Sequence, residues 1–177
     1  VDRLHARFIA VGSDFRFGYQ RKGDVNLLGE LGRVFGYRLE VVKKERYQDQ
    51  DISSSLIREE LEAGNMETVN NLLGYTFSVS GEVLHGRQIG RTLGMPTTNL
   101  VASTRKLLPP NGVYVSVTVI DGKRHPGITN IGYKPTIGEK FKGVETHIFD
   151  FDEDLYGRDI EVKLLHYRRP EQKFSSR

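Results

Sequence analysis

The segment at residues 86–99 gathers residue types that suit a phosphate group and its magnesium ion. It reads GRQIGRTLGMPTTN. Glycines let backbone amides approach an anion closely, and arginine adds a fixed positive charge. Threonine hydroxyls and asparagine amide oxygens are hard, neutral ligands of the kind that Mg²⁺ accepts. The segment therefore predicts a magnesium–phosphate site, with a flexible hairpin connection as the plainer alternative. The candidate phosphate ligands are Gly86, Gly90, Arg91, Gly94, Thr97 and Asn99, of which Thr97 and Asn99 also serve the metal.

A carboxylate stands in an apolar segment further along the chain. In VETHI at residues 144–148, strand alternation places Glu145, His147 and Phe149 on one face. A carboxylate on an inward face needs a purpose, and a general base for an alcohol is one. If the face is exposed instead, Glu145 and His147 are ordinary surface residues. The periodicity leaves both possibilities open. A phosphate site and a base in one small domain suggest phosphoryl transfer.

A third candidate site lies at a predicted helix start with the sequence SSSLIR at residues 53–58. Helix N-termini bind phosphate, so Ser54, Ser55 and Arg58 are candidate phosphate ligands, although simple helix capping is an equally physical reading. The acidic residues between Asp150 and Asp154 lack the spacing of a calcium loop and predict a solvated turn. The five histidines show no metal-binding spacing.

The elements that must position these residues change in type along the chain. The first part alternates between strands and helices, with strands expected at 6–11 and 37–42 and helices at 25–35, 52–61 and 66–73. Asp24 is expected to cap the first helix, and Gly36, Gly64 and Gly74 are expected to end the three helices in turn. After residue 75 the pattern predicts strands at 77–83, 113–120, 127–131, 144–151 and 160–167. Repeated short strands with glycine and proline turns favour a closed antiparallel barrel. A domain boundary is expected near residues 72–76.

Composition narrows the class of protein. The 177 residues are enough for one to one and a half domains. The absence of cysteine excludes disulfides and thiolate metal sites and fits a cytoplasmic location. A formal net charge of +3, with basic residues scattered, does not suggest nucleic acid binding. No apolar run approaches the length of a membrane span, so no membrane partner is expected. Composition says nothing about the oligomeric state.

The motifs taken together resemble the bacterial bifunctional riboflavin kinase/FAD synthetase family. The C-terminal match rests on GEVLHG at 81–86, GRTLGMPTTNL at 90–100, PNGVY at 110–114, NIG at 130–132, KPT at 134–136, VETH at 144–147, LYG at 155–157 and RPEQKF at 169–174. The N-terminal match rests on SDFRFG at 13–18, Arg21, Gly23, Asp24 and ISSSLIR at 52–58. One departure is Thr98, where bacterial members usually carry alanine; it leaves the proposed ligands in place.

The resemblance implies two domains and a reaction. Residues 75–177 would form a six-stranded riboflavin kinase barrel, and residues 1–74 the second half of a Rossmann-like FMN adenylyltransferase domain. The kinase would transfer the γ-phosphate of ATP to the 5′-hydroxyl of riboflavin to give FMN. In that family the Thr and Asn of the Pro-Thr-x-Asn motif serve Mg²⁺–ATP, which corresponds to Thr97 and Asn99. Glu145 would be the base, and the resemblance favours its inward orientation.

The N-terminal resemblance also carries a serious departure. Ser54, Ser55 and Arg58 would contact ATP phosphates, but the family's His-x-Gly-His motif occurs nowhere in this sequence. The opening strand and helix of the Rossmann-like sheet are missing as well. We therefore expect the chain to be part of a longer bifunctional protein that makes FMN and FAD, and we do not expect adenylyl transfer from these residues alone. The alternatives are a flavin- or nucleotide-binding module without turnover, and an unrelated barrel that mediates interactions.

Overall fold

The computed structural model describes residues 3, 5–84, 97–103, 105–135 and 140–172. The chain divides into two compact units, residues 1–52 and residues 53–177. Each unit is described by itself below. The second unit contains a closed six-stranded barrel and two helices, and it holds most of the candidate site residues.

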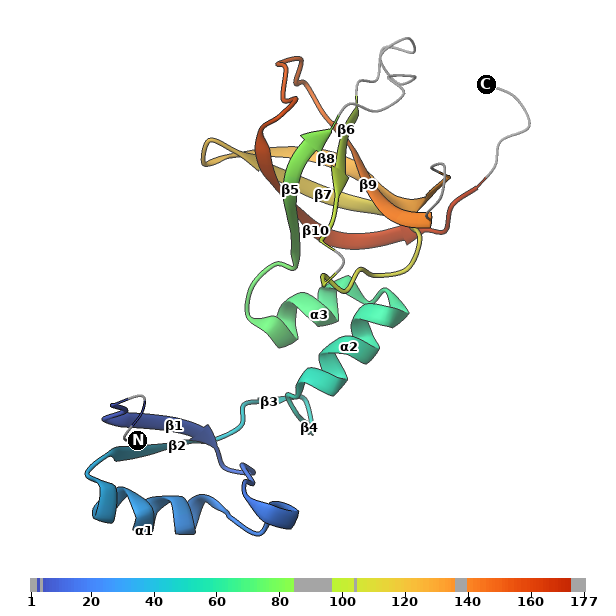
Figure 1. Cartoon of the computed structure of the whole chain (residues 1–177). Coiled ribbons are helices and arrows are strands. Elements are labelled where there is room, and N and C mark those ends of the chain that lie inside the picture. Colours follow the sequence, from blue (N-terminus) through green and yellow to red (C-terminus); the bar gives the residue numbers. More distant parts are fainter. Residues whose placement is uncertain (1–2, 4, 85–96, 104, 136–139, 173–177) are drawn as a thin grey trace. The chain divides into compact units, whose positions relative to one another are not determined.

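The first unit is a small α/β arrangement (Figure 1). Strands β1 (Phe8–Gly12) and β2 (Arg38–Val42) pair in parallel and are connected through the 3-10 helix η1 (Tyr19–Arg21) and helix α1 (Val25–Phe35). Asp24 caps α1 by accepting hydrogen bonds from the backbone amides of Asn26 and Leu27, and Gly36 ends the helix in a left-handed conformation. Both the cap and the helix bounds confirm the sequence prediction. A short unpredicted hairpin, β3 (Arg46–Tyr47) and β4 (Gln50–Asp51), follows.

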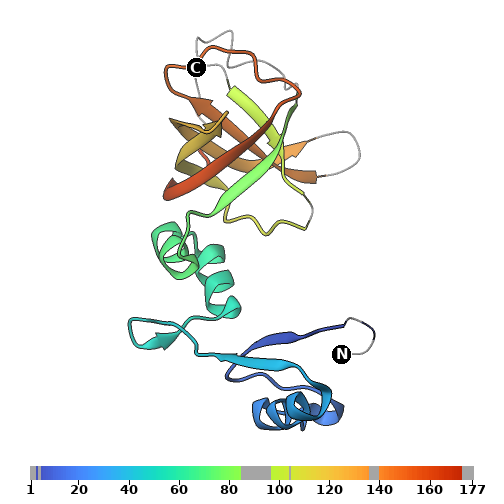
Figure 2. The same cartoon turned by 90° about the vertical axis from the view of Figure 1, so that its left-hand side faces the viewer.

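The barrel closes in the order β10-β5-β6-β9-β8-β7, with every neighbouring pair antiparallel. Closure leaves no unpaired sheet edge in the barrel, so its strands need no covering element to protect an edge. Figure 2 shows the closed ring of strands from a second side. The strands are β5 (Ser78–Leu84), β6 (Thr97–Val101), β7 (Gly112–Ile120), β8 (Lys123–Pro135), β9 (Lys140–Ile148) and β10 (Asp159–Arg169).

Most of these strands were predicted from alternation, and the barrel confirms the predicted architecture. Strand β8 extends beyond the predicted 127–131 at both ends, and β9 begins at Lys140, before the predicted 144. Two further differences concern β6 and the end of β9. Strand β6 was not expected as a strand, because its sequence TTNLV was interpreted through its ligand-type side chains. The strand predicted at 144–151 ends at Ile148, since Phe149 and Asp150 turn away and Asp150 takes a positive φ of 50°.

Two helices at one end of the barrel belong to the same compact unit as the strands (Figures 1 and 2). Helix α2 spans Ser54–Ala63 and α3 spans Met66–Leu73. The side chains of Met66 and Val69 are fully buried in the barrel's hydrophobic core, and the Asn70 amide donates a 3.0 Å hydrogen bond to the carbonyl of Leu164 on β10. The compact unit that contains the barrel thus begins at Ser53, before the predicted domain boundary between residues 74 and 75. That boundary separates two predicted family domains and stays a prediction.

The interior of the barrel is mainly aliphatic but contains a chain of hydroxyl groups. Thr129 Oγ1 lies 2.8 Å from both Ser116 Oγ and Thr146 Oγ1, and all three residues are buried. These bonds offset the cost of removing the three hydroxyl groups from water. Thr146 therefore points inward, which fixes the orientation of its neighbours on β9. In the part of the chain that the structure describes, no helix is long and apolar enough to cross a membrane.

Candidate active site

The structure brings Thr97 and Glu145 into direct contact. Thr97 Oγ1 donates a 2.7 Å hydrogen bond to Glu145 Oε1, across the antiparallel pair of β6 and β9. The two residues are 48 positions apart in the chain, and both are half-buried. The candidate metal ligand and the candidate base, chosen from separate motifs, thus form one group on neighbouring strands.

Glu145 lies on the outer face of the barrel wall, so the expectation that it faces inward is wrong. Its neighbours Val144 and Thr146 are both fully buried, and Ile148 is only 4% exposed. Because successive side chains in a strand point to opposite faces, those three residues take the inner face and Glu145 takes the outer one. A half-buried outer position keeps the carboxylate accessible to a substrate, which a position inside the closed barrel would not.

A row of polar side chains crosses three strands at Glu145. Asn99 on β6 and Asn130 on β8 are its direct partners in the antiparallel register on either side. Directly opposed residues share one face of a sheet, with Cβ atoms about 4.5–5.5 Å apart. The carboxylate is therefore flanked by two carboxamides, with the Thr97 hydroxyl at one corner. His147 shares this face and lies opposite Thr97. Its ring makes an edge contact with Phe149.

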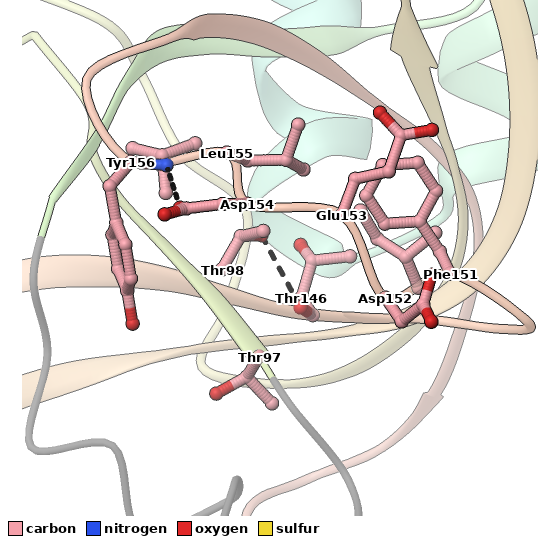
Figure 3. A pocket seen from close by; sticks show the side chains of 11 residues that line it. Thr97, Thr98, Thr146, Phe151, Asp152, Glu153, Asp154, Leu155 and Tyr156 are labelled. Carbon is pink, nitrogen blue, oxygen red and sulfur yellow. Dashed lines mark hydrogen bonds between the residues drawn. The ribbon is translucent and has the colours of Figure 1, made fainter.

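A pocket of about 190 Å³ begins at Thr97 and extends away from this row. Figure 3 shows its walls: Thr97 and Thr98 from β6 and Thr146 from β9 lie across from a segment of the loop between β9 and β10. The floor is apolar, and three carboxylates stand on the loop side. The lining residues are Val83, Thr97, Thr98, Thr146, Ile148, Phe151, Asp152, Glu153, Asp154, Leu155 and Tyr156.

Several contacts fix the loop that forms the pocket wall. Leu155 is buried in the barrel core, and the Asp154 carboxylate accepts a 3.0 Å hydrogen bond from the Tyr156 amide. Arg158 Nη2 lies 2.6 Å from both carboxylate oxygens of Asp121, at the turn between β7 and β8. The Arg158 guanidinium lowers the pKa of the Asp121 carboxyl below its ordinary value of 3.8. The loop is therefore tied to the barrel at its base.

The oxygen donors beside the pocket fit a hard cation such as Mg²⁺. They are the Thr97 hydroxyl, the Asn99 amide oxygen and the Glu145 carboxylate. Magnesium is usually held by one or two carboxylates together with substrate phosphates, not by an all-protein cage. The described residues contain no group of three or more His, Cys, Asp or Glu side chains able to hold a metal ion. The donor set suits a metal that arrives with a nucleotide.

The remaining predicted site residues fall into two groups. Gly86, Gly90, Arg91 and Gly94 lie outside the described residues. Ser54, Ser55 and Arg58 lie exposed in the first turns of α2.

Ser53, the residue before Ser54, caps α2, because its side chain accepts a hydrogen bond from the Leu56 amide. Arg58 donates a 3.4 Å hydrogen bond to the Ser54 carbonyl. Capping thus accounts for Ser53, and phosphate binding by the other three remains a prediction.

Sequence reasoning missed two parts of the site. The acidic residues from Asp150 to Asp154 predicted a solvated turn, although the neighbouring Phe151, Leu155 and Tyr156 gave an apolar signal that could have pointed to a pocket wall. Asn130 was identified only as part of the NIG motif at 130–132, with no role at the site. Its alignment opposite Glu145 depends on the pairing register of β8 and β9, which no local pattern reveals.

Comparisons with known proteins agree with this arrangement. The riboflavin kinase family model matches residues 73–177, and the FAD synthetase family model matches residues 1–56. Bifunctional riboflavin kinase/FMN adenylyltransferase from Buchnera aphidicola subsp. Acyrthosiphon pisum is 43% identical over 182 residues, which cover 100% of this chain and 57% of that protein. The protein of the same name from Escherichia coli K12 is 41% identical, covering 99% of this chain and 56% of that protein.

A solved structure described as a macrolide-efflux protein from Streptococcus pneumoniae has the same fold, with a TM-score of 0.84 and 32% identity. The match covers 99% of this chain and 56% of that one. The chain thus spans somewhat more than half the length of the relatives that it matches. With the kinase family model covering the whole barrel and the site residues in register on its strands, the chain belongs to the riboflavin kinase family and is homologous to bifunctional riboflavin kinase/FMN adenylyltransferases.

Proposed function

We propose that this chain phosphorylates riboflavin, transferring the γ-phosphate of ATP to the 5′-hydroxyl to give FMN. The contact between Thr97 and Glu145 is the observation that carries the proposal. Phosphoryl transfer needs a group that binds the nucleotide's metal and a base for the attacking hydroxyl, with the reacting atoms between them. A metal ligand that is hydrogen-bonded to a carboxylate on the outer face of the barrel supplies both at one place.

The pocket beside Thr97 suits the base end of the nucleotide. Its floor, with Val83, Ile148 and Phe151, would bury a flat heterocycle, and the carboxylates on the loop would accept hydrogen bonds from an exocyclic amine. The acidic wall is unfavourable for phosphates, which would therefore extend from the pocket past Thr97. This orientation directs the γ-phosphate toward Asn99 and Glu145.

Glu145 would accept the proton of the 5′-hydroxyl as that oxygen attacks. Its flanking carboxamides and the Thr97 hydroxyl hold the carboxylate in one orientation, so little reorganisation is needed at the moment of reaction. Thr97 and Asn99 are the residues that would hold Mg²⁺, which when bound would neutralise negative charge on the phosphates. Aligning and shielding the reactants is the contribution of the protein itself.

We further infer that the first unit is part of an FMN adenylyltransferase domain of Rossmann-like type. Its two parallel strands with an intervening helix are the connection typical of such sheets. In a bifunctional protein, Ser54, Ser55 and Arg58 would contact ATP phosphates, and FMN would be converted to FAD. A cytoplasmic location would suit both activities and a cysteine-free chain.

The deciding experiment incubates the chain with riboflavin, ATP and Mg²⁺ and separates the flavins by chromatography. We expect FMN from the wild type and formation slower by about 10²–10⁴-fold with the Glu145→Gln variant. Equal rates from both proteins would reject the assignment of the base, and FMN from neither would reject the proposed activity. Riboflavin binding without turnover in the wild type would support a binding module instead.

A further inference from the structure

A second carboxylate lies on the same outer face as Glu145. Asn130 Nδ2 donates a 3.0 Å hydrogen bond to Oε1 of Glu171, in the segment that follows β10. Asn130 is also the direct register partner of Glu145. Glu171 is thus linked to the candidate base through a single intervening side chain, although the three residues come from three separate parts of the chain.

The place that Glu171 occupies depends on a glycine. Gly132 follows Asn130 by two residues on β8 and shares its face, and a Cβ at this glycine would overlap the Glu171 carboxylate. Its register partner on β9 is Gly143, so neither strand carries a side chain at this level of the outer face. The carboxylate therefore lies against bare backbone beside Asn130.

The hydrogen bond fixes which way the Asn130 amide points. An ionised carboxylate only accepts hydrogen bonds, so the NH₂ group of Asn130 must be the one that faces Glu171. The amide oxygen is then the acceptor of this side chain, on the face that Asn130 shares with Glu145. Among the residues that the structure describes, Glu171 is the hydrogen-bond partner of the Asn130 side chain, so the amide oxygen can accept a hydrogen bond from a ligand.

We propose that Glu171 is a positioning residue that orients Asn130 to accept a hydrogen bond from the ribityl hydroxyl next to the one that reacts. This inference rests on the proposed kinase function. Riboflavin carries hydroxyls on neighbouring carbons of its ribityl chain. Asn130 and Glu145, as an opposed pair, stand about 5 Å apart at Cβ and can each receive one of two such hydroxyls. Glu171 and Asn130 thereby select a polyol chain and place its terminal hydroxyl at the base.

The test compares Asn130→Ala, Glu171→Ala and the double variant, with Gln172→Ala as a control in the same exposed segment. We expect each single variant to raise the KM for riboflavin roughly three- to tenfold, the size of one lost hydrogen bond, with the KM for ATP unchanged. The double variant should match Asn130→Ala alone, because Glu171 acts through that residue. Glu171→Gln keeps an acceptor oxygen and should stay within about threefold of wild type.

A substrate analogue gives the sharpest readout. With 4′-deoxyriboflavin, which lacks the neighbouring hydroxyl, Asn130→Ala should carry no further penalty relative to wild type. If Asn130→Ala does not fold, Asn130→Asp can replace it, because it keeps the shape of the side chain and places a carboxylate against that of Glu171. This variant should raise the KM for riboflavin at least as much.

Three outcomes would overturn the inference alone while leaving the kinase intact. They are an unchanged riboflavin KM in Glu171→Ala, additive effects in the double variant, and an equal penalty on the deoxy analogue. If the wild type forms no FMN, both the proposed kinase function and this inference are rejected.

Discussion

Thr97 donates its hydroxyl hydrogen to the Glu145 carboxylate across 2.7 Å, from a strand that lies beside β9 in the barrel but 48 positions away in the chain. The contact holds the carboxylate in a defined position on the outer face. It also couples the two residues, because a substitution at Thr97 changes the surroundings of the Glu145 carboxylate as well.

Replacing Glu145 by Gln should lower the rate of FMN formation by about 10²–10⁴-fold, since the amide cannot take up the proton of the attacking hydroxyl. Riboflavin and ATP binding should persist, because shape and position are kept. Initial rates by chromatography and flavin binding by fluorescence would measure the two effects. Glu59→Gln, an exposed carboxylate on α2, is the matched control. Turnover at the control's level would show that Glu145 is not the base.

Thr97→Ala removes both a proposed magnesium ligand and the hydrogen bond to Glu145. It should weaken ATP affinity in the presence of Mg²⁺ and also lower kcat, whereas Thr97→Ser keeps the hydroxyl and should retain most of both. Calorimetric ATP titrations with and without Mg²⁺ would check this. If the affinity of Thr97→Ala for ATP is the same as that of wild type with Mg²⁺ present, the ligand assignment is wrong.

Two buried threonines should respond oppositely to the same substitution. Thr129→Val leaves the Ser116 and Thr146 hydroxyls without their shared partner and should cost about 1–3 kcal/mol in the free energy of unfolding. Thr118 Oγ1 is buried and has no hydrogen-bond partner among the described residues, so Thr118→Val should be neutral or stabilising. Urea unfolding followed by circular dichroism would compare them. Equal losses would mean that the hydroxyl chain contributes nothing specific.

The ion pair of Asp121 and Arg158 should add stability that depends on pH. The pKa of Asp121 lies below its ordinary value of 3.8 in the folded state because Arg158 binds the carboxylate. Its contribution is therefore fully present above the ordinary pKa and is lost as pH falls through the lower, folded value. The Tm difference between wild type and Asp121→Asn should stay constant from about pH 7 to about pH 5 and vanish in stronger acid.

Asp159→Asn, an exposed aspartate at the start of β10, is the control for that series. A Tm difference between wild type and Asp121→Asn that persists in strong acid would mean that the ion pair is not its source. The pair is exposed, so added salt should also reduce the difference.

Several features of this protein follow from its sequence by itself. Alternation of apolar residues is a local property, and it correctly predicted the long strands such as Gly112–Ile120 and the closed barrel that they form. Capping is also local, so Asp24, Gly36, Gly64 and Gly74 marked helix ends correctly. The motifs taken together, in their order along the chain, indicated the family.

Tertiary structure alone decided how these pieces meet. Alternation shows that Glu145 and Thr146 point to opposite faces, but which of them enters the barrel depends on which side closes around the core, and the hydroxyl chain through Thr129 settles it. The pairing registers that set Asn130 and Asn99 against Glu145 are likewise relations between distant segments. The acidic loop forms a pocket wall because Leu155 is buried in the core. Its apolar side chain is a local signal, but the core residues around it come from distant segments of the chain.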